Sequence, residues 1–157
     1  MPPVATDLLR EAYLATVLHL QLPDARRVEV APLQRGACHG EFPAGIERLY
    51  VITAANPRSQ PLLGPENASR NDLLRRELLT LVGDPSRILP ARGCSPDGRW
   101  CEESFAVVDP DREALLDLAT RHGQLAVYEW TATHRAVVWT APERADDLQG
   151  WVVSTDG

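Results

Sequence analysis

Apolar side chains recur with a helical period in three segments of the chain. Residues 5–20, 66–82 and 109–122 each repeat apolar positions at spacings of three and four, which predicts three amphipathic helices. Gly83 follows the second segment as a C-terminal stop, and Asp109 stands where the third helix needs an N-cap. The sequence therefore predicts an N-terminal helix and two later ones.

Six shorter segments have the pattern of strands. Residues 48–54 are almost continuously apolar, which is typical of a strand covered on both faces and places it near the centre of a sheet. Asp97-Gly98 lies between two of the other segments and favours a hairpin turn. The six predicted strands are residues 27–30, 48–54, 87–91, 101–108, 124–130 and 135–140.

The order of these elements predicts the fold class. From residue 48 onward it is strand, helix, hairpin, helix and strand, which is the split β-α-β arrangement of the α+β, ferredoxin-like folds. We expect an antiparallel sheet with two helices on one face, an extra N-terminal helix and extra edge strands. The 157 residues fit a single domain, with an N-terminal helix in residues 1–23, an α+β core in residues 27–140 and an acidic tail in residues 141–157.

Charge and composition exclude several functions. The formal net charge is −6, and all sixteen basic residues are arginine, so there is no lysine for a Schiff base or a phosphate-binding loop. An acidic chain is not expected to bind nucleic acid through a basic surface. No apolar run reaches the roughly 20 residues of a membrane helix, and charged residues interrupt the N-terminal segment, so we expect a cytoplasmic protein without membrane contact.

Polar side chains lie on the apolar side of the second predicted helix, in its first turns. Asn67, Arg70 and Asn71 share that side with Leu74. If the side faces the sheet, each unsatisfied polar group costs about 1–3 kcal/mol. Two explanations remain open. The groups hold residues 56–60 against the helix as a structural clamp, or they converge on a polar or anionic ligand at the helix N-terminus.

A second polar cluster is predicted on two strands. Alternation along a strand puts Glu102 and its neighbour Glu103 on opposite faces, so they do not form a carboxylate pair. If one face of each strand meets the other, aromatic walls and hydrogen-bonding groups form a ligand pocket. The alternative is a dimer interface or a surface covered by the N-terminal helix. The residues concerned are Trp100, Glu102 and Ser104 on one strand and Gln124, Ala126, Tyr128 and Trp130 on the other.

An ordered series of short motifs runs from residue 48 to about residue 130. The chain shows Tyr50-Val51-Ile52-Thr53-Ala54, Asn56-Pro57, Glu66-Asn67, Arg70-Asn71, Pro96-Asp97-Gly98, Trp100, Glu102 and Gly123-Gln124. This series resembles a bacterial family classified as a domain of unknown function, the DUF 3293 family. The resemblance implies no activity, cofactor or catalytic residue. It marks as positions of a shared pattern Asn56, Asn67, Arg70, Asn71, Trp100, Glu102 and Gln124.

Cysteine and histidine spacing gives little support to a metal or a nucleophile. Cys38, His39, Cys94, Cys101 and His122 include no pair at a metal-binding spacing, so we expect neither metal nor cofactor. Adjacent Cys38 and His39 rarely face each other as a catalytic pair needs. A two-residue turn would set Cys94 opposite Cys101, whereas a bulged turn would separate them, and reduced thiols are favoured in the cytoplasm.

These observations predict a small ligand-binding or interaction domain. Its polar pocket would take a small polar or anionic molecule. One alternative is a metal-independent enzyme on a small anionic substrate, with Glu102 as general acid or base. Another is an adaptor that acts as a homodimer. The predicted ligand-binding residues are Asn56, Ser59, Asn67, Arg70, Asn71, Trp100, Glu102 and Gln124.

Overall fold

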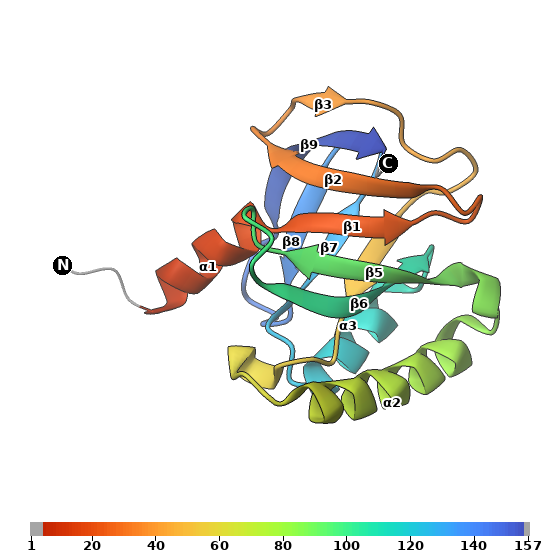
Figure 1. Ribbon diagram of the computed structural model, residues 1–157. Helices are drawn as coiled ribbons and strands as arrows, with labels where there is room; N and C mark the ends of the chain where they lie inside the picture. Colours follow the sequence, from red (N-terminus) through yellow and green to blue (C-terminus); the bar gives the residue numbers. More distant parts are fainter. Residues whose placement is uncertain (1–4, 156–157) are drawn as a thin grey trace.

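Eight antiparallel strands close into a barrel in the computed structural model (Figure 1), which describes the backbone of residues 5–155 and the side chains of residues 8–155. Around the barrel the order is β2-β1-β5-β6-β4-β7-β8-β9, and β9 pairs with β2 to close it. A short strand, β3 (Cys38–His39), adds to β9 in parallel. The barrel strands are β1 (Val17–Gln21), β2 (Arg27–Leu33), β4 (Leu49–Ile52), β5 (Ile88–Cys94), β6 (Cys101–Val108), β7 (Ala126–Trp130), β8 (Arg135–Trp139) and β9 (Asp147–Thr155).

The prediction of an open, ferredoxin-like sheet is wrong. The predicted helix over residues 5–20 ends at Ala15, and β1 follows it and pairs with both β2 and β5. The predicted acidic tail contains β9, which joins β8 to β2. These two strands turn an open sheet into a closed one without edges. Residues 1–4 and 156–157 of the predicted helix and tail lie outside the described residues.

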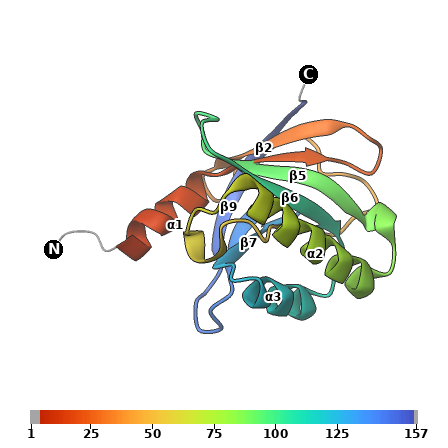
Figure 2. The same ribbon diagram turned by 60° about the horizontal axis from the view of Figure 1, so that its bottom comes forward.

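The barrel has two apolar cores, one on each side of its wall. Inward-facing side chains such as Leu18, Val51 and Trp130 fill the interior, and Phe42 from the loop before β4 packs edge-on against Trp130. Outward-facing residues of β4, β6, β7 and β8 are covered by α2 (Gly64–Val82) and α3 (Arg112–Arg121), which lie along one side of the barrel (Figure 2). Period-two alternation in each strand supplies both cores.

The helix boundaries follow local capping chemistry. The α2 helix begins at Gly64 with Pro65 in its first turn and ends at Gly83, whose φ of 72° lets its N–H bond to the Leu79 carbonyl. The predicted N-cap of α3 is corrected, because Asp111 caps the helix. Asp109 instead accepts hydrogen bonds from the N–H groups of Glu47 and Arg48, and so joins the start of β4 to the end of β6.

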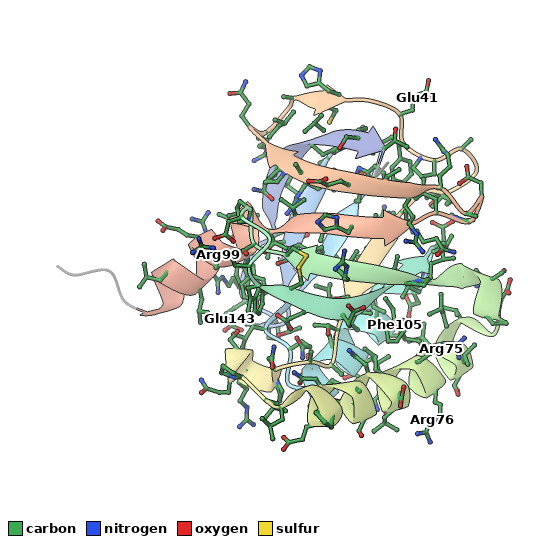
Figure 3. All side chains as sticks on the ribbon, in the orientation of Figure 1. Glu41, Arg75, Arg76, Arg99, Phe105 and Glu143 are labelled. Atoms are coloured by element: carbon green, nitrogen blue, oxygen red, sulfur yellow. A yellow bond between two sulfur atoms is a disulfide. The ribbon has the colours of Figure 1, made fainter. Side chains whose placement is uncertain are left out.

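The β5-β6 hairpin is crosslinked at its turn. Cys94 stands directly opposite Cys101, and the two form a disulfide that is visible as the sulfur–sulfur bond in Figure 3. Reduced thiols were expected, and the structure corrects that prediction. The turn itself spans Ser95 to Trp100, whose backbone groups bond across it at 2.8 Å. Because Trp100 and Glu102 flank Cys101, the disulfide fixes the strand positions beside it.

Candidate functional site

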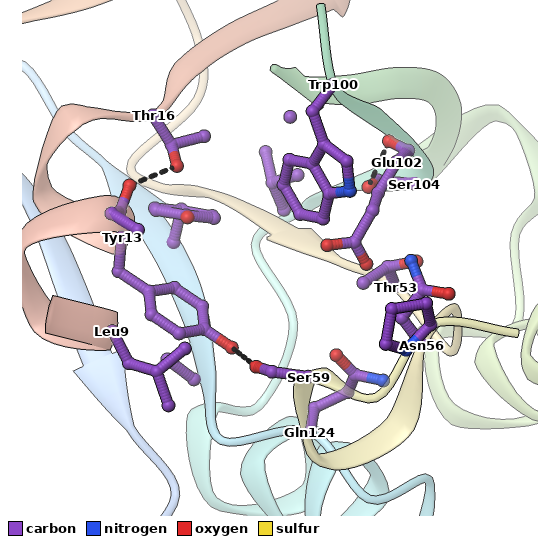
Figure 4. A pocket seen from close by; sticks show the side chains of 16 residues that line it. Leu9, Tyr13, Thr16, Thr53, Asn56, Ser59, Trp100, Glu102, Ser104 and Gln124 are labelled. Carbon is purple, nitrogen blue, oxygen red and sulfur yellow. Dashed lines mark hydrogen bonds between the residues drawn. The ribbon is translucent and has the colours of Figure 1, made fainter. Parts of the chain in front are cut away.

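A cavity of about 310 Å³ opens at one end of the barrel. That volume is at the lower end of the range for small-molecule sites. Strand residues form its floor and one wall, and α1 (Ala5–Ala15) and the loop before α2 form the other sides (Figure 4). The lining residues are Leu9, Ala12, Tyr13, Thr16, Val51, Thr53, Asn56, Ser59, Pro61, Gly93, Trp100, Glu102, Ser104, Gln124, Ala126 and Tyr128.

The two predicted strand faces meet in this cavity. Glu102 and Ser104 of β6 and Ala126 and Tyr128 of β7 all point inward, and β4 lies between these strands with Val51 opposite Tyr128. The prediction that the faces coincide is therefore confirmed, except that Trp130 does not line the cavity and packs against Phe42 and Trp151 inside the barrel. Trp100 at the end of the hairpin is half exposed, so it stands at the rim of the cavity.

The α1 helix covers the open end of the barrel on one side. The Tyr13 ring packs against Tyr128 with centroids 6.1 Å apart and against Trp139 at 5.2 Å. The Tyr13 hydroxyl lies 3.4 Å from the Ser59 hydroxyl, so the helix also touches the loop that carries Ser59 across the cavity (Figure 4). A helix, a loop and the barrel wall thus enclose one space.

Asn67, Arg70 and Asn71 hold backbone groups and do not line the cavity. The Asn67 amide accepts from the Asn56 N–H and donates to the Asn56 side chain, both at 2.8 Å. Arg70 donates through Nε to the Ala54 carbonyl at 2.9 Å and through Nη2 to the His122 carbonyl at 3.0 Å. Asn71 accepts from the Ala54 N–H. A structural clamp is confirmed, but its anchor points are Ala54, Asn56 and Leu62, so it holds residues 54–62 and not residues 56–60 alone. Direct ligand binding by these three residues stays a prediction.

The other predicted site residues do line the cavity. They are Asn56, Ser59, Trp100, Glu102 and Gln124. Gln124 also takes part in the clamp, because its Nε2 donates to the Ala55 carbonyl at 3.0 Å. The clamp residues of α2 therefore fix the loop, and the loop presents Asn56 and Ser59 to the cavity.

Sequence reasoning missed Tyr13 and Thr53 as lining residues. Tyr13 belongs to the N-terminal helix, which the sequence predicts as a cover for this face only as an alternative to a ligand pocket, so its side chains were not counted as lining residues. Thr53 belonged to a strand expected to be buried on both faces. In the structure its hydroxyl donates to the Glu103 carbonyl at 2.7 Å, where β4 ends at the cavity.

Glu102 is the charged group of this site. Burial raises the pKa of its carboxyl from 4.5 to about 7. Among the described residues its carboxylate has no hydrogen-bond donor or basic partner. Burying a carboxylate without a partner costs stability, and such groups are concentrated at functional sites.

Replacing Glu102 by glutamine is expected to stabilise the protein at about pH 8 by about 1–3 kcal/mol and to have little effect at about pH 4.5. Because the folded-state pKa is raised, the folded protein holds a proton that the unfolded chain has lost. Stability in the native protein therefore falls as pH rises from 4.5 to about 7, and glutamine removes that loss. Urea denaturation across this range measures the difference.

Glu103→Gln is the control for that measurement, because Glu103 is the next residue of β6 and is exposed on the outer face of the barrel. Its stability difference from the native protein should show no such rise with pH. A Glu102→Gln difference that is the same at both pH values would contradict the burial of an unpaired carboxylate.

The cysteine and histidine candidates do not assemble a further site. In the described residues, no group of three or more histidine, cysteine or acidic side chains is placed to hold a metal ion. Cys38 donates from Sγ to the Thr133 carbonyl at 3.4 Å, and its neighbour His39 is exposed. Across the part of the chain that the structure describes, no helix combines the length and apolar character needed to cross a membrane.

Comparison with known families agrees with the resemblance noted in the sequence. Residues 52–127 match the family described as "Protein of unknown function (DUF3293)". The resemblance is thereby confirmed for the segment that runs from the last residue of β4 through the clamp and the β5-β6 hairpin to the start of β7. The chain matches no curated protein. It matches no solved structure.

Proposed function

We propose that the mouth of the barrel binds a small organic molecule. The observation that carries the proposal is a cavity of about 310 Å³ with aromatic walls and, inside it, a carboxylate that has no partner among the described residues. Eight-stranded barrels of this kind have room for one small ligand. The clamp on residues 54–62 supports the same role, because a rigid loop keeps the cavity open in advance of binding.

A panel of small fragments that includes neutral, cationic and anionic members tests this proposal by ligand-observed NMR. Fragments are expected to bind in the cavity, and Ala126→Phe is expected to weaken them at least tenfold because the added ring fills the floor. Ala132→Phe is the matched control, since Ala132 is exposed in the β7-β8 turn. A panel without binders, or binders that Ala126→Phe leaves unchanged, would refute the pocket.

The second candidate is an enzyme that uses Glu102 as general acid or base. A carboxyl with a pKa of about 7 can both take up and release a proton near neutral pH, which favours this role. An enzyme would lose turnover in Glu102→Gln while a bound substrate is still retained. A binder would show no turnover in the native protein. The homodimeric adaptor stays a prediction of the sequence.

A further inference from the structure

One described residue gives the cavity its charge. Among the lining side chains that the structure describes, Glu102 alone is charged. Arg70, which was expected to hold an anion, is bonded to the carbonyls of Ala54 and His122. Arg135 is fully buried deeper in the barrel and lies 5.7 Å from the Tyr128 ring centroid. Tyr128 itself lines the cavity, so the guanidinium stands beyond the cavity wall.

Several polar groups that line the cavity already donate their hydrogen bonds to other groups of the protein. The hydroxyls of Thr16, Thr53 and Ser104 donate to backbone carbonyls, at 2.9, 2.7 and 3.1 Å respectively. Gln124 donates from Nε2 to the carbonyls of Ala55 and His122, which leaves its Oε1 as an acceptor. The Gln124 Oε1, the Glu102 carboxylate and the hydroxyl oxygens of Thr16 and Ser104 can therefore accept hydrogen bonds from a ligand, whereas the Thr53 hydroxyl oxygen already accepts one from the Ala55 N–H at 3.0 Å.

Aromatic rings surround the same space. Tyr13 and Tyr128 pack together at one wall, and Trp100 stands at the rim on the side of Glu102 (Figure 4). The face of an aromatic ring attracts a cation, and the attraction increases when water is excluded. Acceptors, one carboxylate and three aromatic rings together match a positively charged hydrogen-bond donor.

We infer that the ligand of this cavity is a small organic cation, a protonated amine or amidine on a short apolar body, with its charged group paired to Glu102. The inference rests on the proposed function and gives it a ligand class. The amine N–H groups donate to Glu102 and to the Gln124 oxygen, and the apolar body lies against Tyr13 and Tyr128. An anion in the same place would face the Glu102 carboxylate, and no lining residue within the described part of the chain would offer it a positive charge.

Three probes of similar size test the charge preference: 2-phenylethylamine, 2-phenylethanol and phenylacetate. At about pH 8 we expect the amine to bind at least tenfold more tightly than either of the others, measured by titration calorimetry or NMR. In Glu102→Gln the advantage of the amine is expected to disappear. Glu103→Gln, on the outer face of the same strand, should preserve it.

The pH profile provides an independent readout. Amine affinity is expected to fall about thirtyfold from about pH 8 to about pH 5.5. The reason is that the amine pairs with ionised Glu102, and the ionised fraction of a carboxyl with a pKa of about 7 decreases by that factor. Tyr13 from α1 and Tyr128 from β7 also face this carboxyl, and burial raises the pKa of both, so they stay neutral throughout. Arg135 from β8 stays charged, although burial lowers its pKa to about 10.

The results of these experiments distinguish a failure of the cation preference from a failure of the proposed small-molecule binding. In one outcome, phenylethanol or phenylacetate binds as tightly as the amine, with an affinity that Ala126→Phe weakens. That result would overturn the cation preference and leave the pocket established. Amine affinity that is unchanged in Glu102→Gln or across pH would also overturn it. If none of the probes and no fragment of the panel binds, the proposed function itself is refuted.

Discussion

Replacing Glu129 by glutamine is expected to lower the free energy of unfolding by about 3–5 kcal/mol at neutral pH. Glu129 faces outward from β7 but is only 3% exposed. Its carboxylate accepts a hydrogen bond from the Tyr50 hydroxyl, lies 2.7 Å from Nε2 of His134 and pairs with Arg112 of α3 at 3.1 Å. A neutral amide leaves the Arg112 charge partly uncompensated and offers one oxygen where the carboxylate offers two.

The effect has a defined pH dependence. Burial acts to raise the pKa of Glu129, but the hydrogen bonds from Tyr50 and His134 and the charge of Arg112 outweigh it and leave the pKa below 4.5. A lowered folded-state pKa gives stability that is present above the unfolded value and is lost as pH falls through the folded one. The native protein should therefore lose its advantage over the variant in acid.

Chemical denaturation at about pH 7 and about pH 3 measures both parts of this prediction. Glu103→Gln changes an outward-facing glutamate of β6 that is exposed, and we expect less than about 0.5 kcal/mol from it. Equal effects of the two substitutions at neutral pH would show that the Glu129 network contributes nothing beyond a surface charge.

Glu129 could not be found by sequence reasoning, for a reason that applies to the whole fold. In Tyr128-Glu129-Trp130 a polar residue between two aromatic ones indicates a strand with one face in water. The outer face of β7 is instead covered by α3, whose Arg112 supplies the compensating charge. Period-two alternation tells inside from outside in a strand, but not whether the outside is exposed.

Sequence reasoning missed the closed barrel because it did not predict two of its strands, β1 and β9. Leu18 and Leu20 of β1 continue the apolar spacing of the preceding helix, so residues 17–20, four of the five residues of this strand, are counted as its last turn. In β9, Asp147 at the start and the short polar end give the impression of an acidic tail, although Trp151 is buried inside the barrel. Both assignments depend on partners distant in sequence, and local periodicity carries no such information.

Within the site, the sequence identified what strand and helix periods determine. Alternation placed Glu102 and Ser104 on one face, and the helical period placed Asn67, Arg70 and Asn71 toward the sheet, as the structure has them. The choice between clamp and ligand required the positions of the carbonyl groups of the loop, which only the folded chain supplies. The charge of the cavity follows from that choice: because Arg70 is held in the clamp, Glu102 is the charged side chain among the described lining residues.

Asn71→Ala is expected to lower the free energy of unfolding by about 2–4 kcal/mol, because it removes two hydrogen bonds and leaves a buried donor unsatisfied. Asn71 is 8% exposed, accepts from the Ala54 N–H at 2.8 Å and donates to the Glu103 carbonyl at 3.0 Å. The Thr53 hydroxyl still satisfies that carbonyl, so the unpaired group in the variant is the Ala54 N–H. Denaturant unfolding measures the loss, and exchange of the Ala54 amide with solvent should become faster.

The neighbouring Asp72→Ala is the matched control, since Asp72 is exposed on the outer side of α2 and should change stability by less than about 0.5 kcal/mol.

Asn71→Ala also tests how the clamp serves the cavity. Asn71 does not line the cavity, yet it holds the end of β4, from which Thr53 and the loop with Asn56 and Ser59 extend into it. At a temperature where the variant is folded, we expect it to bind the probes more weakly, because the loop is no longer held by Asn71. An undiminished affinity would mean that the loop keeps its position without Asn71.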